Sequence, residues 1–144
     1  MGFLKSTILA IFISILMLLP SVNSHAADDF IIVANTDDKD LTLTKVQVKN
    51  LFMRRAFKYE LEPVILPPGH MLRILFNTKI VGLTESRIQS YWAQMRFSGR
   101  KVEPTQITTE RLIIEYLLKN KGSIAYLSGN TIIPENLTIV YSTD

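Results

Sequence analysis

Residues 63–76 read PVILPPGHMLRILF, and they contain a strand, a tight turn and a helix in direct succession. Residues 63–66 predict a short buried strand, because an apolar run of this length bounded by turn residues is typical of a covered sheet. The Pro-Pro-Gly sequence at 67–69 ends that strand. The apolar side chains of residues 71–76 then share one side of a helix. This strand–turn–helix unit is typical of α/β domains.

The rest of the chain repeats this alternation on both sides of the quoted stretch. Continuous or alternating apolar runs predict further strands, at residues 30–34, 123–127 and 137–141. Helical spacing of apolar residues predicts three further helices, which begin after the N-cap candidates Thr44, Thr84 and Thr109. Strands that alternate with helices favour a mostly parallel sheet flanked by helices. The expected fold class is therefore α/β, in one domain over residues 27–144.

The amino-terminal segment has the three parts of a secretory signal peptide. A lysine near the start is followed by an apolar run at residues 8–19, and Ser-His-Ala at residues 24–26 resembles a cleavage site. The alternative is a permanent membrane anchor, but the run covers about a dozen residues where a span needs about twenty. We therefore expect residues 1–26 to be removed, with cleavage near Ala26 or Ala27. The mature protein is then periplasmic and has no membrane span.

Composition excludes several classes of function. The chain of 144 residues has no cysteine, which excludes disulfides and thiolate metal sites, and its formal net charge is only +3. The short basic groups at residues 54–58 and 96–101 are interpreted as solvated surface, so no nucleic-acid partner is expected. His70 is the single histidine of the mature part, and neither a phosphate-binding glycine loop nor a nucleophilic serine motif occurs. We expect no enzyme activity, no cofactor and no metal.

The turn at residues 67–70 is the candidate binding site, because a helix begins directly after it. Backbone N–H groups at a helix start, together with the helix dipole, favour an anion. Gly69, His70 and Met71 present this backbone, and Arg73 lies in the first turn of the helix. These four residues are the predicted ligands of a small anion such as phosphate. An ordinary connection between a strand and a helix is the alternative.

Three segments, in order along the chain, resemble the phosphate ABC transporter substrate-binding protein-like family, in its small single-domain branch. Residues 41–53 resemble the LT-x-x-x-x-x-x-IF helix of phosphate-type periplasmic binding proteins. Residues 91–104 contain Tyr-Trp, then Phe-Ser-Gly-Arg, then a proline, and they resemble a W…FSG…P segment. Residues 122–127, GSIAYL, resemble the GAIGY strand. The resemblance implies a single lobe of the type II periplasmic-binding-protein fold.

The resemblance also implies where phosphate binds, and there the chain departs from the family pattern. The turn that supplies hydroxyl and backbone donors in the family corresponds to residues 68–72. His70 stands in place of a serine and Leu72 in place of a threonine, so two hydroxyl donors are missing. Arg54 stands in place of the glycine in the IF-x-G turn.

Two functions remain open from the sequence. One is a periplasmic binding protein that holds phosphate or a similar small anion, in association with a transporter. The other is a degenerate relative without a ligand, which acts as an accessory or sensory partner of an envelope transporter or receptor complex. The first depends on the backbone amides of the turn together with His70 and Arg73.

Overall fold

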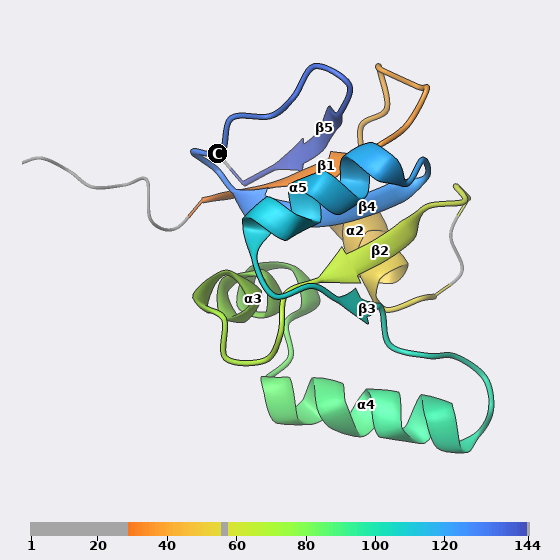
Figure 1. Cartoon of the computed structure of the whole chain (residues 1–144). Coiled ribbons are helices and arrows are strands. Elements are labelled where there is room, and N and C mark those ends of the chain that lie inside the picture. Colours follow the sequence, from red (N-terminus) through yellow and green to blue (C-terminus); the bar gives the residue numbers. More distant parts are fainter. Residues whose placement is uncertain (1–28, 56–57, 144) are drawn as a thin grey trace, which may run out of the picture.

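The computed structural model describes residues 29–55 and 58–143, which form a five-stranded sheet with helices packed against it (Figure 1). The strands, in chain order, are β1 (Phe30–Ala34), β2 (Glu62–Ile65), β3 (Thr105–Gln106), β4 (Ser123–Ser128) and β5 (Thr138–Ser142). The helices are α2 (Lys45–Phe52), α3 (Met71–Phe76), α4 (Glu85–Phe97) and α5 (Glu110–Lys119), and a π-helical turn, η2 (Asn77–Val81), continues α3. The predicted signal peptide lies outside the described residues.

The α/β class is confirmed, but the sheet is mixed rather than mostly parallel. Its strand order is β3-β2-β4-β1-β5. β2 pairs in parallel with β3 and β4, whereas β1 pairs antiparallel with both β4 and β5. Helical crossovers make β2, β3 and β4 parallel, as the alternation of strands and helices predicts. The prediction fails at β1, because this first strand inserts between the last two strands of the chain, and local sequence does not encode that pairing.

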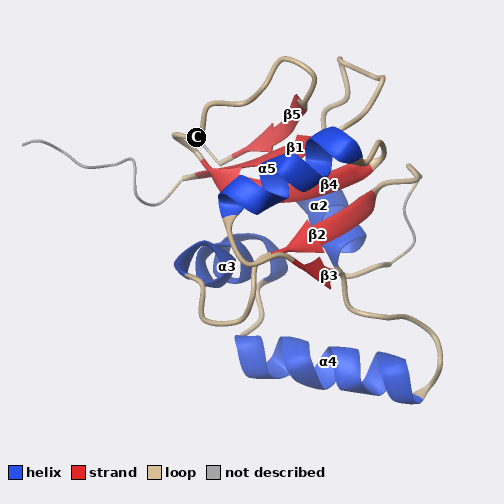
Figure 2. Cartoon of the chain, in the orientation of Figure 1, coloured by secondary structure: helices blue, strands red, loops and turns tan. Residues whose placement is uncertain are grey.

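Helices cover both faces of the sheet (Figure 2). In Figure 1, α5 crosses in front of the sheet, where it buries Ile113 and Leu117 completely, and α2 lies behind it. On the α2 side, the ring of Phe76 stacks on Tyr126 with centroids 4.3 Å apart, and Phe52 lies 4.8 Å from Phe76. These rings bury large apolar areas, so they anchor α2 and α3 to β4. The central strands β1 and β4 are buried on both faces, which explains their continuous apolar sequences.

The predicted helix starts are confirmed, with one difference in capping. Thr44 begins α2 with a capping box: its hydroxyl accepts from the Gln47 N–H, and the Gln47 side chain accepts from the Thr44 N–H. Thr109 begins α5 in the ordinary way, by accepting from a backbone N–H of the first turn. Thr84 precedes α4 without such a bond, and its hydroxyl contacts that of Ser86 instead.

The helix after the Pro-Pro-Gly turn extends beyond the predicted run. It continues from α3 through η2 and ends at Gly82, whose φ of 71° is in the left-handed region that favours glycine. Ile80 and Val81 are buried, which supplies the apolar contacts that hold η2 in place. The extension also brings Asn77 into the interior, where its side-chain amide donates to Glu85 at 2.9 Å.

α4 lies at the lower edge of Figure 1 and reaches the core through a few side chains. Ile88 and Trp92 are its buried residues, and the Tyr91 hydroxyl donates to the Met53 carbonyl at 2.9 Å. The chain then returns through β3, which the sequence did not predict because two residues carry no periodicity. Within the described ranges, no helix combines the length and the hydrophobicity of a membrane span.

Candidate functional site

The predicted anion site at residues 67–71 lies at the carboxyl end of β2, where ligands usually bind in open α/β sheets. The turn is open to solvent: Gly69 is exposed with a left-handed φ of 87°, and Met71 is 75% exposed. His70 caps α3, because its Nδ1 accepts a hydrogen bond from the Leu72 N–H at 3.2 Å. One amide of the turn and one imidazole nitrogen are therefore already partnered. Binding of an anion at this turn stays a prediction.

Arg73 is separated from the rest of the predicted site. Its side chain is 3% exposed and meets Glu85 through two bonds, from Nε at 2.9 Å and from Nη2 at 2.6 Å. Nη2 also lies 3.2 Å from the Glu103 carboxylate, and Nη1 donates to the Leu66 carbonyl at 2.7 Å. The guanidinium is thus held by acceptors of the chain itself. It does not face the turn, and the structure assigns it to the interior.

Glu85 is the acceptor around which this interior cluster is built. Burial raises the pKa of Glu85, but hydrogen bonds from Arg73, Gln89 and Asn77 and the positive charge of Arg73 outweigh it. The net pKa therefore lies below its ordinary value of 4.5. The carboxylate is ionised at neutral pH, so the pair joins α3 and η2 to α4 as a structural link.

Donors at the carboxyl end of β4 are occupied in the same way. Glu110, the first residue of α5, accepts from the N–H of Ser128 at 2.8 Å and from its hydroxyl at 2.7 Å. The Thr131 hydroxyl lies 3.4 Å from the same carboxylate. Backbone and hydroxyl donors that converge on one carboxylate form an anion site filled by the chain's own anion. An external anion would have to displace Glu110 here.

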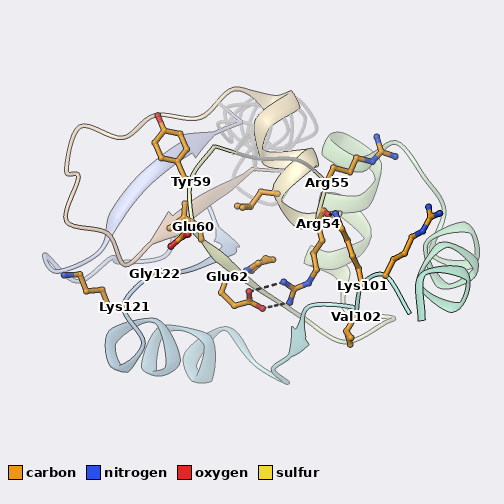
Figure 3. Close-up of a pocket in the computed structure, with 13 residues that line it drawn as sticks. Arg54, Arg55, Tyr59, Glu60, Glu62, Lys101, Val102, Lys121 and Gly122 are labelled. Atoms are coloured by element: carbon orange, nitrogen blue, oxygen red, sulfur yellow. Dashed lines mark hydrogen bonds and ion pairs between the residues drawn. The ribbon is translucent and has the colours of Figure 1, made fainter. Parts of the chain in front are cut away.

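A pocket open to solvent lies at the opposite end of β2, beside its first residues (Figure 3). Its volume is about 820 Å³. The lining carries five cationic side chains and two carboxylates, namely Arg54, Arg55, Arg100, Lys101 and Lys121 with Glu60 and Glu62. We call it the basic pocket. An excess of positive charge in a hollow raises the local concentration of anions, which makes this the stronger candidate for an anion site.

Arg54 lies at the centre of the basic pocket in an unusual conformation. Its φ of 49° is the one positive value at a non-glycine residue of the described chain, and its N–H donates to the Leu51 carbonyl at 3.0 Å. Both terminal guanidinium nitrogens meet the Glu62 carboxylate, with Nη1 3.0 Å from Oε2 (dashed in Figure 3). Lys101 donates through Nζ to the Arg54 carbonyl. The Arg54 Nε is buried and has no hydrogen-bond partner among the described residues.

Arg55 and Arg100 complete the positive rim. Both are exposed, and neither side chain has an ion pair or hydrogen bond to another residue in the described part of the chain. Lys121, at the far side of the pocket, pairs with Asp37 at 2.5 Å. Both arginines line the same pocket, so their positive charges favour an anion there.

The convergence of these arginines could not be read from the sequence. Residues 54–55 and 100–101 are far apart along the chain, and each group alone resembles solvated surface. The fold brings the end of α2 against the segment that leads into β3. The one available signal was that residues 54–55 directly follow the first family-like segment and that residues 100–101 lie within the second.

The described residues contain no group of three or more His, Cys, Asp or Glu side chains that could hold a metal ion. No protein-family model matches the chain, and no curated protein matches it significantly.

Proposed function

We propose that this chain is an exported binding protein for a small oxyanion such as phosphate, and that the anion binds in the basic pocket rather than at residues 67–71. One observation carries the proposal. The three segments that resemble phosphate-type substrate-binding proteins are far apart in sequence, yet each contributes to this pocket. Leu51 belongs to the first segment, Arg100 to the second and Gly122 to the third, and all three line it.

The charges of the two candidate sites support the same choice. At the carboxyl end of the sheet, Arg73 and Ser128 are engaged by the chain's own carboxylates. In the basic pocket, Arg55 and Arg100 are exposed cations that line the hollow. Because the pocket is open, water screens these charges, and we expect affinity in the millimolar range, which corresponds to about 4 kcal/mol.

The conformation of Arg54 supports the resemblance on which the proposal draws. The family pattern has glycine at this position, and glycine is the residue that adopts positive φ without steric cost. Arg54 keeps a φ of 49°. If the family turn is retained and its glycine is replaced, a positive φ at a residue other than glycine is the expected result. The five-stranded mixed sheet with helices on both faces supports the α/β class and does not by itself select the implied fold.

Titration calorimetry of the purified protein with sodium phosphate, at constant ionic strength, tests the proposal. The double variant Arg55→Ala/Arg100→Ala should weaken binding by about tenfold, because it removes two donors to a charged ligand. The matched control is Arg87→Ala/Arg111→Ala, which removes the same charge from exposed positions outside the pocket. This control should stay within about twofold of the wild type.

A third variant separates the pocket from the turn. His70→Ala removes the cap of α3 and the imidazole of the originally predicted site, and it should leave phosphate affinity unchanged. If His70→Ala abolishes binding while the double arginine variant retains it, the anion binds at the turn and the pocket assignment is wrong.

The accessory role remains a second candidate because of two exposed apolar side chains that flank Arg100 along the chain. Phe97, at the end of α4, is 97% exposed, and Val102, which lines the basic pocket, is 65% exposed. Exposed apolar groups of this size mark protein contacts when they lie together. Under this candidate, Phe97→Ser abolishes crosslinking to an envelope partner, the double arginine variant leaves it intact, and phosphate gives no heat with any protein.

A further inference from the structure

The structure places a carboxylate of the chain where a ligand oxyanion would bind Arg54. We propose that Glu62 is an internal competitor for the anion: its carboxylate occupies the guanidinium fork of Arg54, and the bound ligand takes its place. The inference rests on the proposed function and deepens it in two respects. It names the ligand class, an oxyanion with two oxygens that span the fork, and it names the group that limits affinity.

The geometry of the pair defines that ligand class. Nη1 of Arg54 lies 3.0 Å from Oε2 of Glu62, and Nη2 meets Oε1, so each terminal nitrogen has its own oxygen. A carboxylate and a phosphate each present two oxygens at a similar spacing, and the guanidinium fork recognises both. A spherical anion such as chloride cannot supply two separate acceptors. Selectivity for oxyanions over chloride is therefore expected at this position.

Exposure makes Glu62 displaceable. Its side chain is 54% exposed and that of Arg54 is 25% exposed, so water reaches the pair. Exposed ion pairs contribute little net stability, because screening and side-chain entropy offset the attraction. Glu62 is also the first residue of β2, and its carboxylate can turn into solvent without the loss of a strand hydrogen bond.

Arg54, in contrast, is held in place. The Leu51 carbonyl and Lys101 Nζ fix its backbone on both sides. A residue kept at a left-handed φ against its steric preference indicates that the surroundings determine its position. Its Nε is buried and has no partner among the described residues, so the inner end of the guanidinium lies within the protein. The fork is therefore carried on a fixed backbone, and the more exposed acceptor is the movable half of the pair.

The test compares two carboxylates of the same pocket. Glu62→Gln removes the competing charge at the fork, and Glu60→Gln removes the same charge from the pocket without touching Arg54. In calorimetry with sodium phosphate, Glu62→Gln should bind about fivefold more tightly than the wild type, which is the range of one exposed ion pair. Glu60→Gln should change the affinity by less than about twofold. Sodium chloride at equal ionic strength should give no saturable heat with any of the three proteins.

The same comparison in an Arg54→Lys variant shows whether the effect depends on the guanidinium fork. Arg54→Lys retains the charge but removes the planar pair of donors, so the gain from Glu62→Gln should disappear in the Arg54→Lys protein. The proposal that Glu62 competes with the anion is refuted if Glu62→Gln leaves phosphate affinity unchanged, or if Glu60→Gln gives an equal gain. Those results leave wild-type binding in place, so the proposed function survives them. If neither the wild type nor Glu62→Gln binds phosphate, the proposed function is wrong, and so is the role of Glu62 as a competitor.

Discussion

Arg73 and Arg54 each direct a guanidinium fork at a glutamate, but the two pairs lie in different surroundings. The Arg73 side chain is 3% exposed and lies between α3 and α4, where Glu85, Glu103 and a backbone carbonyl hold it. The Arg54 side chain is 25% exposed in an open pocket, and its partner Glu62 is 54% exposed. The same pairing chemistry therefore serves structure in one place and is available to a ligand in the other. The exposure of the pair, and not the presence of an arginine, separates the two roles.

The same substitution at the two arginines tests this comparison most strongly. Arg73→Met should lower the free energy of unfolding by about 3 kcal/mol, because it leaves two partly buried carboxylates and the buried Leu66 carbonyl without their donor. Arg54→Met should lower it by less than about 1 kcal/mol, since the pair it breaks is exposed. Urea denaturation followed by circular dichroism measures both. Equal losses for the two variants would show that burial does not distinguish them.

The second prediction concerns the other side chain that satisfies the Leu66 backbone. The Leu66 N–H donates to the buried Tyr126 hydroxyl at 3.0 Å, and burial raises the pKa of this phenol well above its ordinary value of 10.0. Tyr126→Phe keeps the stacked ring but leaves that N–H unpaired. It should lower the free energy of unfolding by about 1–3 kcal/mol. Tyr91→Phe is the control, because its hydroxyl is only partly buried; a larger loss there would contradict this account.

The sequence predicts elements of this molecule better than contacts between them. Apolar runs and threonine caps locate β1, β2, β4, β5 and the helix starts, because these signals depend on neighbouring residues. The direction of β1 depends on its insertion between β4 and β5, and nothing local in residues 30–34 specifies that pairing. β3 is too short to carry a pattern. The fold class was therefore predictable, and the parallel character of the sheet was not.

The candidate site shows the same limit. Helix spacing places Arg73 in the first turn of α3 but does not reveal that Glu85, on the next helix, holds it in the interior. Likewise, Arg54 and Arg100 form one pocket only because α2 ends against the segment that precedes β3. Gly69 and His70 do lie together in an exposed turn, as their adjacency requires. Adjacent groups could be predicted, and groups that meet through tertiary contacts could not.

The third prediction is a pH dependence that belongs to the partly buried pair of Arg73 and Glu85. The pKa of Glu85 in the folded protein lies below its ordinary value of 4.5, so the unfolded state binds the proton more readily. The stability that Glu85 contributes is fully present above that ordinary value and is lost as the pH falls through the lowered pKa of the folded state. The difference in unfolding free energy between the wild type and Glu85→Gln should therefore be constant at neutral pH and shrink in acid. Urea titrations across the acid range measure it, and a difference that grows in acid would refute the assigned direction.

The smallest expected effect separates the contribution of the Arg54 backbone to stability from that of its side chain. Arg54→Ala and Arg54→Gly both remove the pair with Glu62, but only glycine also relieves the left-handed φ of 49°. Arg54→Gly should therefore be more stable than Arg54→Ala by about 1 kcal/mol in urea denaturation. Equal stabilities would mean that the turn relaxes once the guanidinium is gone, and the fork would then not be preorganised. A higher stability of Arg54→Gly than of Arg54→Ala means that the surrounding structure fixes the φ of this turn without the pair with Glu62. The position of Arg54 is then the same whether Glu62 or a ligand oxyanion binds its side chain.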